Sequence, residues 1–213
     1  MPGPGTILEG LRSIANDGIV VAGVWHLCLA AACVALLFGW RPSQRAAATG
    51  MAAPVASVAV AAFRYDNPFN GIVFAALAAG MLGLAARLER RPVTVRGTAS
   101  TIVGAVMIAF GWLYPHFLEQ RSPALYLVAA PMGLIPCPTL SLIIGLTFLA
   151  GGFGSRAWMF VLAAAGLFYG VFGAARLGVR IDLVLAAGAL SLIILGLRHG
   201  LVAALRRRSP APG

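Results

Sequence analysis

Along almost the whole chain, long apolar runs alternate with short polar or charged segments. A helix needs about 20 consecutive apolar residues to cross the hydrocarbon core of a bilayer. Runs of this kind predict an all-α, polytopic membrane bundle of about seven transmembrane helices. The predicted spans are residues 18–40, 46–63, 69–88, 99–118, 137–150, 157–177 and 181–197.

The segments that flank the predicted bundle, residues 18–197, have different patterns. Residues 1–17 predict an amphipathic helix lying in the membrane interface, with a frayed terminus as the alternative. Residues 198–213 predict a basic cytoplasmic tail that ends the last span. The apolar positions at helical intervals in the first segment are Ile7, Leu8, Leu11 and Ile14.

The composition supports a membrane protein and argues against a soluble one. Of the 213 residues, 60% are hydrophobic and 10% are charged, whereas about a quarter of an average soluble domain is charged. All 16 basic residues are Arg, and most stand at the ends of apolar runs. The net charge of +10 therefore indicates contact with lipid headgroups. The expected partner is the lipid bilayer, and no nucleic acid is expected.

The distribution of Arg predicts the orientation in the membrane. With the N-terminus outside, the inner segments hold 11 Arg residues and the outer segments hold five. Cytoplasmic loops carry an excess of basic residues. We therefore predict an outer N-terminus and a cytoplasmic C-terminus.

The most unusual local sequence is residues 131–139, where Pro131, Pro136 and Pro138 interrupt an apolar stretch. Each proline removes a backbone N–H and restrains the residue before it, so a regular helix cannot continue through the three. Irregular backbone at membrane depth is tolerated where it is buried in protein or lines a wet cavity. We therefore predict a Pro-rich broken or re-entrant segment, residues 122–136, before the fifth helix.

Cys137 is the reactive residue within this stretch. Pro138 is well suited to the first turn of a new helix, which places Cys137 at or near the N-cap with Thr139 close by. A thiol at the positive end of a helix dipole is a candidate nucleophile or soft-metal ligand. The alternative interpretation is a small buried residue at a proline-shaped bend.

Several other polar residues fall in the outer half of the predicted bundle. His26 lies in the outer half of the first span, and ionisable groups at membrane depth usually face the protein interior or water. The hypothesis is an outward-facing pocket near Cys137 and His26. Its candidate residues are Cys137, His26, Thr139, His116, Asp182 and Asn67. The alternatives are a packing role for His26 beside Trp25 and a turn role for Asn67.

The same residues allow a metal hypothesis. Thiolate, thioether and imidazole groups are ligands for soft metal ions such as copper. Cys33 stands seven residues after His26, so the two share a helix face, whereas Cys28 does not. The candidate metal ligands are Cys137, His26, Cys33 and Met132.

Small residues recur in the sixth predicted span. Gly166 and Gly170 form a G-x-x-x-G motif, and Gly173 extends that face. Such motifs allow helix backbones to approach closely. We expect these glycines to pack within the bundle, with a dimer interface as the alternative.

These features together resemble an uncharacterised family of bacterial multi-pass membrane proteins, a domain of unknown function with a G-x-P-C-P-T signature. The resemblance rests on Trp25 in the first span, Asn67-Pro68 before the third, Tyr114-Pro115 at the end of the fourth, and residues 133–139, Gly-Leu-Ile-Pro-Cys-Pro-Thr. Here two residues, not one, separate the glycine from the first proline. The resemblance covers roughly residues 6–197 and implies a bacterial multi-pass membrane protein, which we expect in the inner membrane. It implies no activity.

Three functional hypotheses follow from the sequence. The first is binding or transport of a small solute or soft metal ion through the predicted pocket, without catalytic chemistry. The second is a membrane thiol-redox enzyme that uses Cys137 with Cys28 or Cys33. The third is a non-catalytic accessory subunit that packs against a membrane-protein partner or against a second copy of the chain.

Overall fold

The computed structural model describes residues 3–95, 97–119 and 122–208. These residues form helices joined by short loops, and no strand occurs among them beyond one isolated bridge. The helices are α1 (Pro4–Asp17), α2 (Ile19–Leu37), α3 (Gln44–Arg64), α4 (Pro68–Ala86), α5 (Thr98–Leu113), α6 (Pro123–Ala129), α7 (Pro136–Leu149), α8 (Arg156–Arg176) and α9 (Leu183–Arg208). The turns η1 (Gly151–Gly154) and η2 (Arg180–Asp182) precede α8 and α9. The predicted all-α fold class is confirmed.

Within the described residues, five helical segments are long and apolar enough to cross a membrane. Four are helices α2, α3, α4 and α8, and the fifth, Arg180–Leu201, is formed by η2 and most of α9. The other two predicted spans form shorter apolar helices, α5 and α7. The fourth predicted span ends early because the backbone leaves the helix after Leu113.

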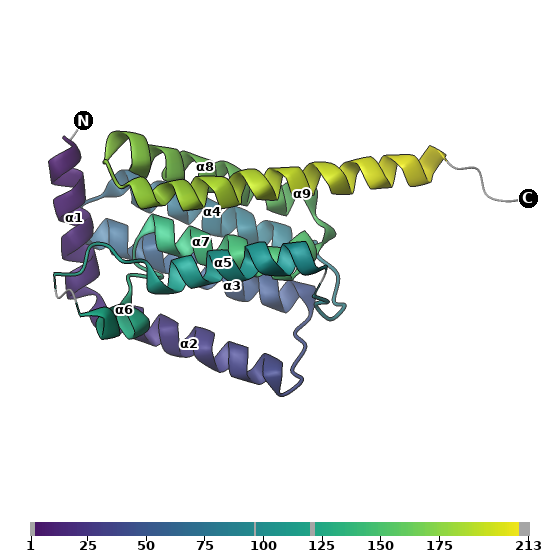
Figure 1. Ribbon diagram of the computed structural model, residues 1–213, viewed down its shortest axis with the longest axis horizontal. Helices are drawn as coiled ribbons and strands as arrows, with labels where there is room; N and C mark the ends of the chain where they lie inside the picture. Colours follow the sequence, from purple (N-terminus) through teal and green to yellow (C-terminus); the bar gives the residue numbers. More distant parts are fainter. Residues whose placement is uncertain (1–2, 96, 120–121, 209–213) are drawn as a thin grey trace, which may run out of the picture.

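Most packed pairs of helices, such as α3 and α4, α5 and α7, and α8 and α9, run antiparallel, and α1 lies across one end of the bundle (Figure 1). The end that α1 covers is called the α1 end below. In the antiparallel pair α5 and α7, Gly111 lies against Pro138, and Gly104 lies against Gly145 further along. In the pair α8 and α9, Gly166 lies against Ala189. Helix α2 lies at the edge of the bundle, and α9 extends beyond the other helices (Figure 1).

Helix α7 occupies the centre of the bundle. All of its residues are buried except Cys137, Leu146 and Leu149, and its apolar side chains point in all directions. A helix that is apolar all round is stable only when other elements surround it. Helices α3, α5, α8 and α9 supply that surrounding. Because other helices surround α7, this helix of only 14 residues can lie in the centre of a bundle of longer apolar helices.

The Pro-rich segment is interrupted by a turn, as its sequence predicted. Helix α6 ends at Ala129, and residues 130–135 form a turn before α7. Gly133 has a positive φ of 74° and lies against the indole of Trp25, where a Cβ would overlap the ring. Thr139 Oγ1 accepts a hydrogen bond from the Gly133 N–H (2.8 Å) and donates one to the Ile135 carbonyl (2.8 Å). Thr139, a predicted pocket residue, therefore fixes this turn.

The two ends of the bundle are closed in different ways. At the α1 end, α1 buries Leu11, Ile14 and Ala15 against the bundle. At the opposite end, the segment before α3 pairs with the segment after α4, and the Val93 N–H donates to the Pro42 carbonyl (2.9 Å). Residues 198–208 of the predicted tail continue α9 as a helix, and residues 209–213 lie outside the described part of the chain.

Candidate functional site

A cluster of three polar side chains lies inside the bundle at the α1 end. The Tyr114 hydroxyl donates to Asp182 Oδ1 (2.7 Å), and the Cys137 thiol donates to Asp182 Oδ2 (3.2 Å). Asp182 is 2% exposed and Tyr114 is 0% exposed. The carboxylate thus receives one hydrogen bond at each oxygen, both from uncharged donors. These residues are called the Cys137–Asp182–Tyr114 cluster below.

Three separate elements position the cluster. Tyr114 directly follows α5, Cys137 lies in the first turn of α7, and Asp182 ends the turn η2 before α9. We expected Cys137 at or near the N-cap of its helix, and it lies near it: Ile135 is the N-cap and Pro136 is the first helical residue. Pro136 rather than Pro138 therefore begins the helix, and Cys137 is its second residue. This position leaves the thiol near the N-terminus of α7 and directs it toward η2.

Glycines on α8 make room for the carboxylate. A Cβ at Gly173 would overlap Asp182 Oδ2, and one at Gly170 would lie 2.7 Å from the Ala186 backbone N. A Cβ at Gly166 would lie 2.9 Å from that of Ala189. The G-x-x-x-G face therefore packs against α9 within the chain, as predicted, and it allows η2 to bring Asp182 against α8.

A second buried polar pair adjoins the cluster. The Tyr169 hydroxyl donates to Asn70 Oδ1 (2.8 Å), and the Tyr169 carbonyl lies 4.0 Å from Cys137 Sγ. Ser141, four residues after Cys137, shares its face of α7 one turn further from the α1 end. Ser141 is fully buried, and its hydroxyl has no hydrogen-bond partner in the described residues. Polar groups thus extend from Asp182 into the bundle.

Helix α1 holds the loop that carries Tyr114. Both groups of the Asn16 side-chain amide bind this loop: Nδ2 donates to the Phe117 carbonyl (3.0 Å), and Oδ1 accepts from the Glu119 N–H (3.0 Å). Phe117 has a positive φ of 77°, which a residue other than glycine rarely adopts. The side-chain amide of Asn16 therefore supplies the hydrogen-bond partners of the Phe117 carbonyl and the Glu119 N–H, and it holds the loop that carries Tyr114.

Loss of this contact is expected to expose Cys137. In a Cys28→Ser/Cys33→Ser background, where Cys137 is the only thiol, Asn16→Ala should raise the rate of maleimide labelling roughly thirtyfold, because it removes the two hydrogen bonds to the loop, of about 1 kcal/mol each. The matched control is Ser13→Ala, since the Ser13 hydroxyl bonds only to the Glu9 carbonyl within α1. Equal labelling rates for the two variants would show that α1 does not restrict access.

The other predicted pocket residues lie outside the cluster. His26 binds backbone carbonyls of α2 and α5. His116 packs edge-on against Phe117, with ring centroids 4.3 Å apart. Partial burial of the His116 imidazole lowers its pKa below the ordinary value, and the positive charge of Arg12 lowers this pKa further. Asn67 is the N-cap of α4, where Oδ1 accepts from the Asn70 N–H (3.2 Å).

The proposed metal ligands are distributed over different parts of the bundle. Cys28 and Cys33 are exposed free thiols on α2. Met132 is buried beside Leu29 and Leu142. In the described residues, no group of three or more His, Cys, Asp and Glu side chains is arranged to hold a metal ion. Of the predicted pocket residues, the structure brings together only Cys137 and Asp182 through a direct hydrogen bond.

Sequence reasoning missed Tyr114, which completes the cluster, and it also missed the adjoining pair of Tyr169 and Asn70. We placed Tyr114 only at the end of the fourth predicted span, but its side chain is fully buried and bonded to Asp182. Tyr169 and Asn70 were not identified as site residues. The available signal for Tyr114 was Pro115, since a residue before proline is biased away from the helix. No signal in the sequence pairs Tyr169 with Asn70, which are 99 residues apart.

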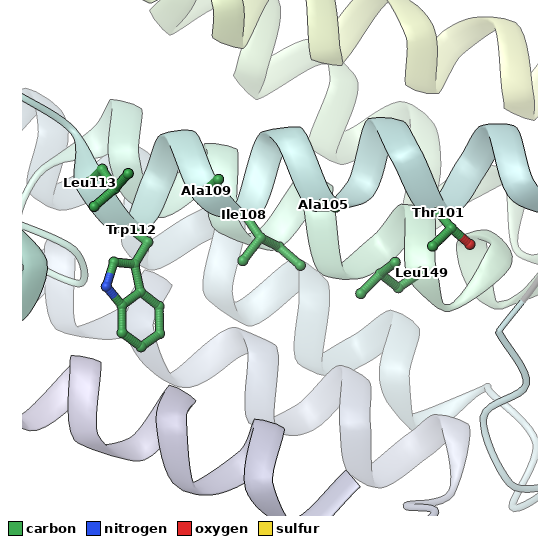
Figure 2. Close-up of a pocket in the computed structure, with 7 residues that line it drawn as sticks. All are labelled: Thr101, Ala105, Ile108, Ala109, Trp112, Leu113 and Leu149. Atoms are coloured by element: carbon green, nitrogen blue, oxygen red, sulfur yellow. The ribbon is translucent and has the colours of Figure 1, made fainter. Parts of the chain in front are cut away.

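A shallow groove of about 480 Å³ runs along α5. Figure 2 shows its lining side chains, which include Ile108, Trp112 and Leu149. The one polar lining residue, Thr101, donates its hydroxyl to the Gly97 carbonyl (3.0 Å). The groove therefore offers an apolar surface without a free polar group, and the Cys137–Asp182–Tyr114 cluster is the better candidate for a functional site.

No protein-family model, curated protein or solved structure matches the chain.

Proposed function

We propose that this protein binds and transports a small polar solute across the membrane at the Cys137–Asp182–Tyr114 cluster. The apolar helices α2, α3, α4, α8 and α9 are compatible with an integral membrane protein. Ionisable residues inside membrane bundles are rare, and they commonly belong to solute or ion pathways. Broken helices whose N-termini face a ligand recur in transporters. Cys137 lies in the first turn of α7, directly after the break at residues 130–135.

The observation that carries the proposal is the environment of Asp182. Its carboxylate is buried, and its two hydrogen bonds come from uncharged donors. In the described residues no Arg or His side chain forms an ion pair with it. Burying a carboxylate away from water is unfavourable unless it is paired. A group kept there despite this cost is a good candidate for contact with a solute that supplies hydrogen bonds or positive charge.

The soft-metal form of the proposal is less well supported than the polar-solute form. Cys137 supplies one thiol at the cluster, and Asp182 and Tyr114 supply oxygen. Soft metal ions favour sites with several sulfur or imidazole ligands. The redox alternative needs a second thiol beside Cys137. Cys28 and Cys33 are exposed on α2, and the hydrogen-bond partners of Cys137 in the described residues are Asp182 and the Tyr169 carbonyl.

The proposed membrane arrangement follows the Arg distribution. We propose that α5 and α7 cross the bilayer together with the five longer segments, which gives seven crossings. A central helix such as α7 need not contact lipid along its whole length. In this arrangement the α1 end faces outward in a bacterial inner membrane, and the C-terminal end of α9 is cytoplasmic. A solute from outside then reaches Asp182 when α1 and the loop carrying Tyr114 move aside.

Protection of Cys137 from a membrane-impermeant maleimide tests the proposal. The experiment uses right-side-out vesicles that carry the Cys28→Ser/Cys33→Ser background. The probes are ammonium and methylammonium salts, amino acids, silver(I), copper(I) and a small-molecule filtrate of bacterial cells. We expect at least one probe to slow labelling of Cys137 severalfold, and Asp182→Asn to abolish this protection, because the solute competes for space beside the thiol and binds the carboxylate.

The matched control is Ser191→Ala, which changes a polar residue of α9 bonded only to the Ala187 carbonyl (2.9 Å). Protection should be unchanged in this variant. Absence of protection by every probe would contradict solute binding and favour the accessory-subunit hypothesis. Absence of any labelling from the outer side, with rapid labelling from inside, would contradict the proposed orientation.

A further inference from the structure

Helix α2 packs against the bundle only through its first half. Its buried residues are Ala22, His26 and Leu29, and none of residues 30–37 is buried. Helix α2 also leans away from α3 and α5 as it leaves the α1 end (Figure 1). Within the described part of the chain, the second half of α2 is therefore not covered by another helix.

The side of α3 that faces α2 is also uncovered. Ser57 marks this side, because its hydroxyl accepts a hydrogen bond from Trp25 Nε1 on α2 (3.0 Å). Ala53, Gly50 and Ala46 follow at helical intervals toward the start of α3, and all three are exposed. A Cβ at Gly50 would meet no atom within 4 Å. The second half of α2 thus stands opposite small side chains without covering them.

The groove along α5 opens beside the same half of α2. Leu29, the last buried residue of α2, packs in one apolar cluster with Ile108 and Trp112 of the groove. Figure 2 shows Ile108 and Trp112 pointing to the same side of α5. The Trp112 indole lies edge-on to His26, with ring centroids 5.0 Å apart, and its Nε1 donates to the Leu127 carbonyl of α6 (2.8 Å). These contacts close the groove at the α1 end.

The length and the lining of the groove fit a hydrocarbon chain. Thr101 and Trp112 line its two ends and stand 11 positions apart, a rise of about 16 Å at 1.5 Å per residue. One leaflet of a bilayer contributes about 15 Å of hydrocarbon, half of the whole core. The hydroxyl of Thr101 is already bonded to the Gly97 carbonyl. An acyl chain in the groove thus makes apolar contacts along its length and displaces no polar partner.

The opposite end of the groove lies at a basic end of the bundle. Helix α5 begins just after the paired segments that precede α3 and follow α4. Residues 38–45 and 87–95 carry five Arg and one acidic residue, Glu89, which pairs with Arg91. Arg41 is exposed, and its guanidinium donates to two backbone carbonyls at the end of α2. The excess of positive charge favours an anionic lipid headgroup at this end.

We propose that one anionic phospholipid binds between α2 and α5, with an acyl chain in the groove and its phosphate beside Arg41. The groove matches the apolar part of such a molecule, and the basic end matches its negative headgroup. A zwitterionic phospholipid matches only the first of these features, because its headgroup carries no net charge. The bound chain fills the space that α2 leaves. The site rests on the membrane arrangement proposed above, and it does not involve the Cys137–Asp182–Tyr114 cluster.

Native mass spectrometry of the full chain tests this site. The protein is released from micelles that contain equal amounts of phosphatidylglycerol, which is anionic, and phosphatidylcholine, which is zwitterionic. We expect one retained phosphatidylglycerol per chain, in severalfold excess over phosphatidylcholine. Ala105→Phe places a ring in the groove and should reduce this retention roughly tenfold, because the loss of about two methylene contacts weakens binding by that factor. Ala105 is exposed, so the larger side chain does not disturb the core.

Matched variants separate the groove and the charge from general effects. Val106→Phe adds the same ring at an exposed position of α5 outside the groove, and retention should be unchanged. Arg41→Gln should remove most of the preference for phosphatidylglycerol. Arg64→Gln should leave the preference intact, because Arg64 is the exposed last residue of α3 and lies at the α1 end.

Three results would overturn the proposal. The first is equal retention of the two lipids by the unmodified chain, and the second is equal retention of phosphatidylglycerol by Ala105→Phe and Val106→Phe. The third is a lipid-free pair of chains that Ala105→Phe separates, because a second copy would then occupy the groove. Protection of Cys137 by solutes is a separate measurement, so failure of the solute proposal and failure of the lipid site are distinguishable.

Discussion

Replacement of Gly145 by alanine should destabilise the protein by about 3 kcal/mol, the upper end of the usual cost of overpacking. A Cβ at Gly145 would lie 2.7 Å from the Gly104 carbonyl oxygen and 2.8 Å from the Ile108 backbone N. Both neighbours are backbone atoms of α5, so neither moves without displacing the whole helix. Because α7 is the centre of the bundle, its separation from α5 would loosen the whole core.

The control for this prediction is Gly80→Ala on α4. A Cβ at Gly80 meets no atom within 4 Å, and alanine has the higher helix propensity, so no loss is expected. The free energy of unfolding of both variants is measured by denaturant titration of the protein in micelles. Equal stabilities would contradict the close packing of α5 against α7.

Removal of the Asp182 carboxylate should also strongly destabilise the protein. Asp182→Ala leaves the Tyr114 hydroxyl without an acceptor inside the bundle, and it leaves the Cys137 thiol only the more distant Tyr169 carbonyl (4.0 Å). An unsatisfied buried donor costs about 1 to 3 kcal/mol, so the expected total loss is about 3 kcal/mol. A double-mutant cycle with Tyr114→Phe should give a coupling energy of about 2 kcal/mol, because each single change already breaks the same hydrogen bond.

The matched cycle uses Tyr169→Phe in place of Tyr114→Phe. Tyr169 is also a buried tyrosine, but its hydroxyl binds Asn70 and not Asp182. Its effect should add to that of Asp182→Ala within about 0.5 kcal/mol. The unfolding free energies of all the single and double variants supply both coupling energies. A coupling near zero for Tyr114 and Asp182 would show that the hydrogen bond does not hold the cluster together.

Much of the secondary structure follows from sequence because it depends on neighbouring residues. The predicted span at 69–88 corresponds to α4 (Pro68–Ala86), and the span at 137–150 corresponds to α7 (Pro136–Leu149). In these cases the ends of the apolar run coincide with local signals, such as the N-cap Asn67 and the prolines at the helix starts. Local chemistry thus fixes where a helix begins and ends.

The rotation of each helix was harder to predict. Helix α2 is apolar all round, so its sequence does not specify which side faces the bundle. We predicted that His26 shares a pocket with Cys137, whereas its direct partners are the Ala22 and Trp112 carbonyls. The position of Trp112 O at the end of α5 became apparent only when the structure placed α2 beside it.

The sequence by itself determined the class of the protein, the apolar helices, the break before α7 and the presence of Cys137 at the start of that helix. Only the tertiary structure decided that Cys137 and Tyr114 both bind Asp182, from 45 and 68 residues away. The hydropathy of a residue indicates whether it is favourable in lipid or in a protein core, and the spacing of apolar residues predicts helix or strand. Neither property specifies which helices are neighbours. That choice depends on close packing, as where Gly173 leaves room for the Asp182 carboxylate.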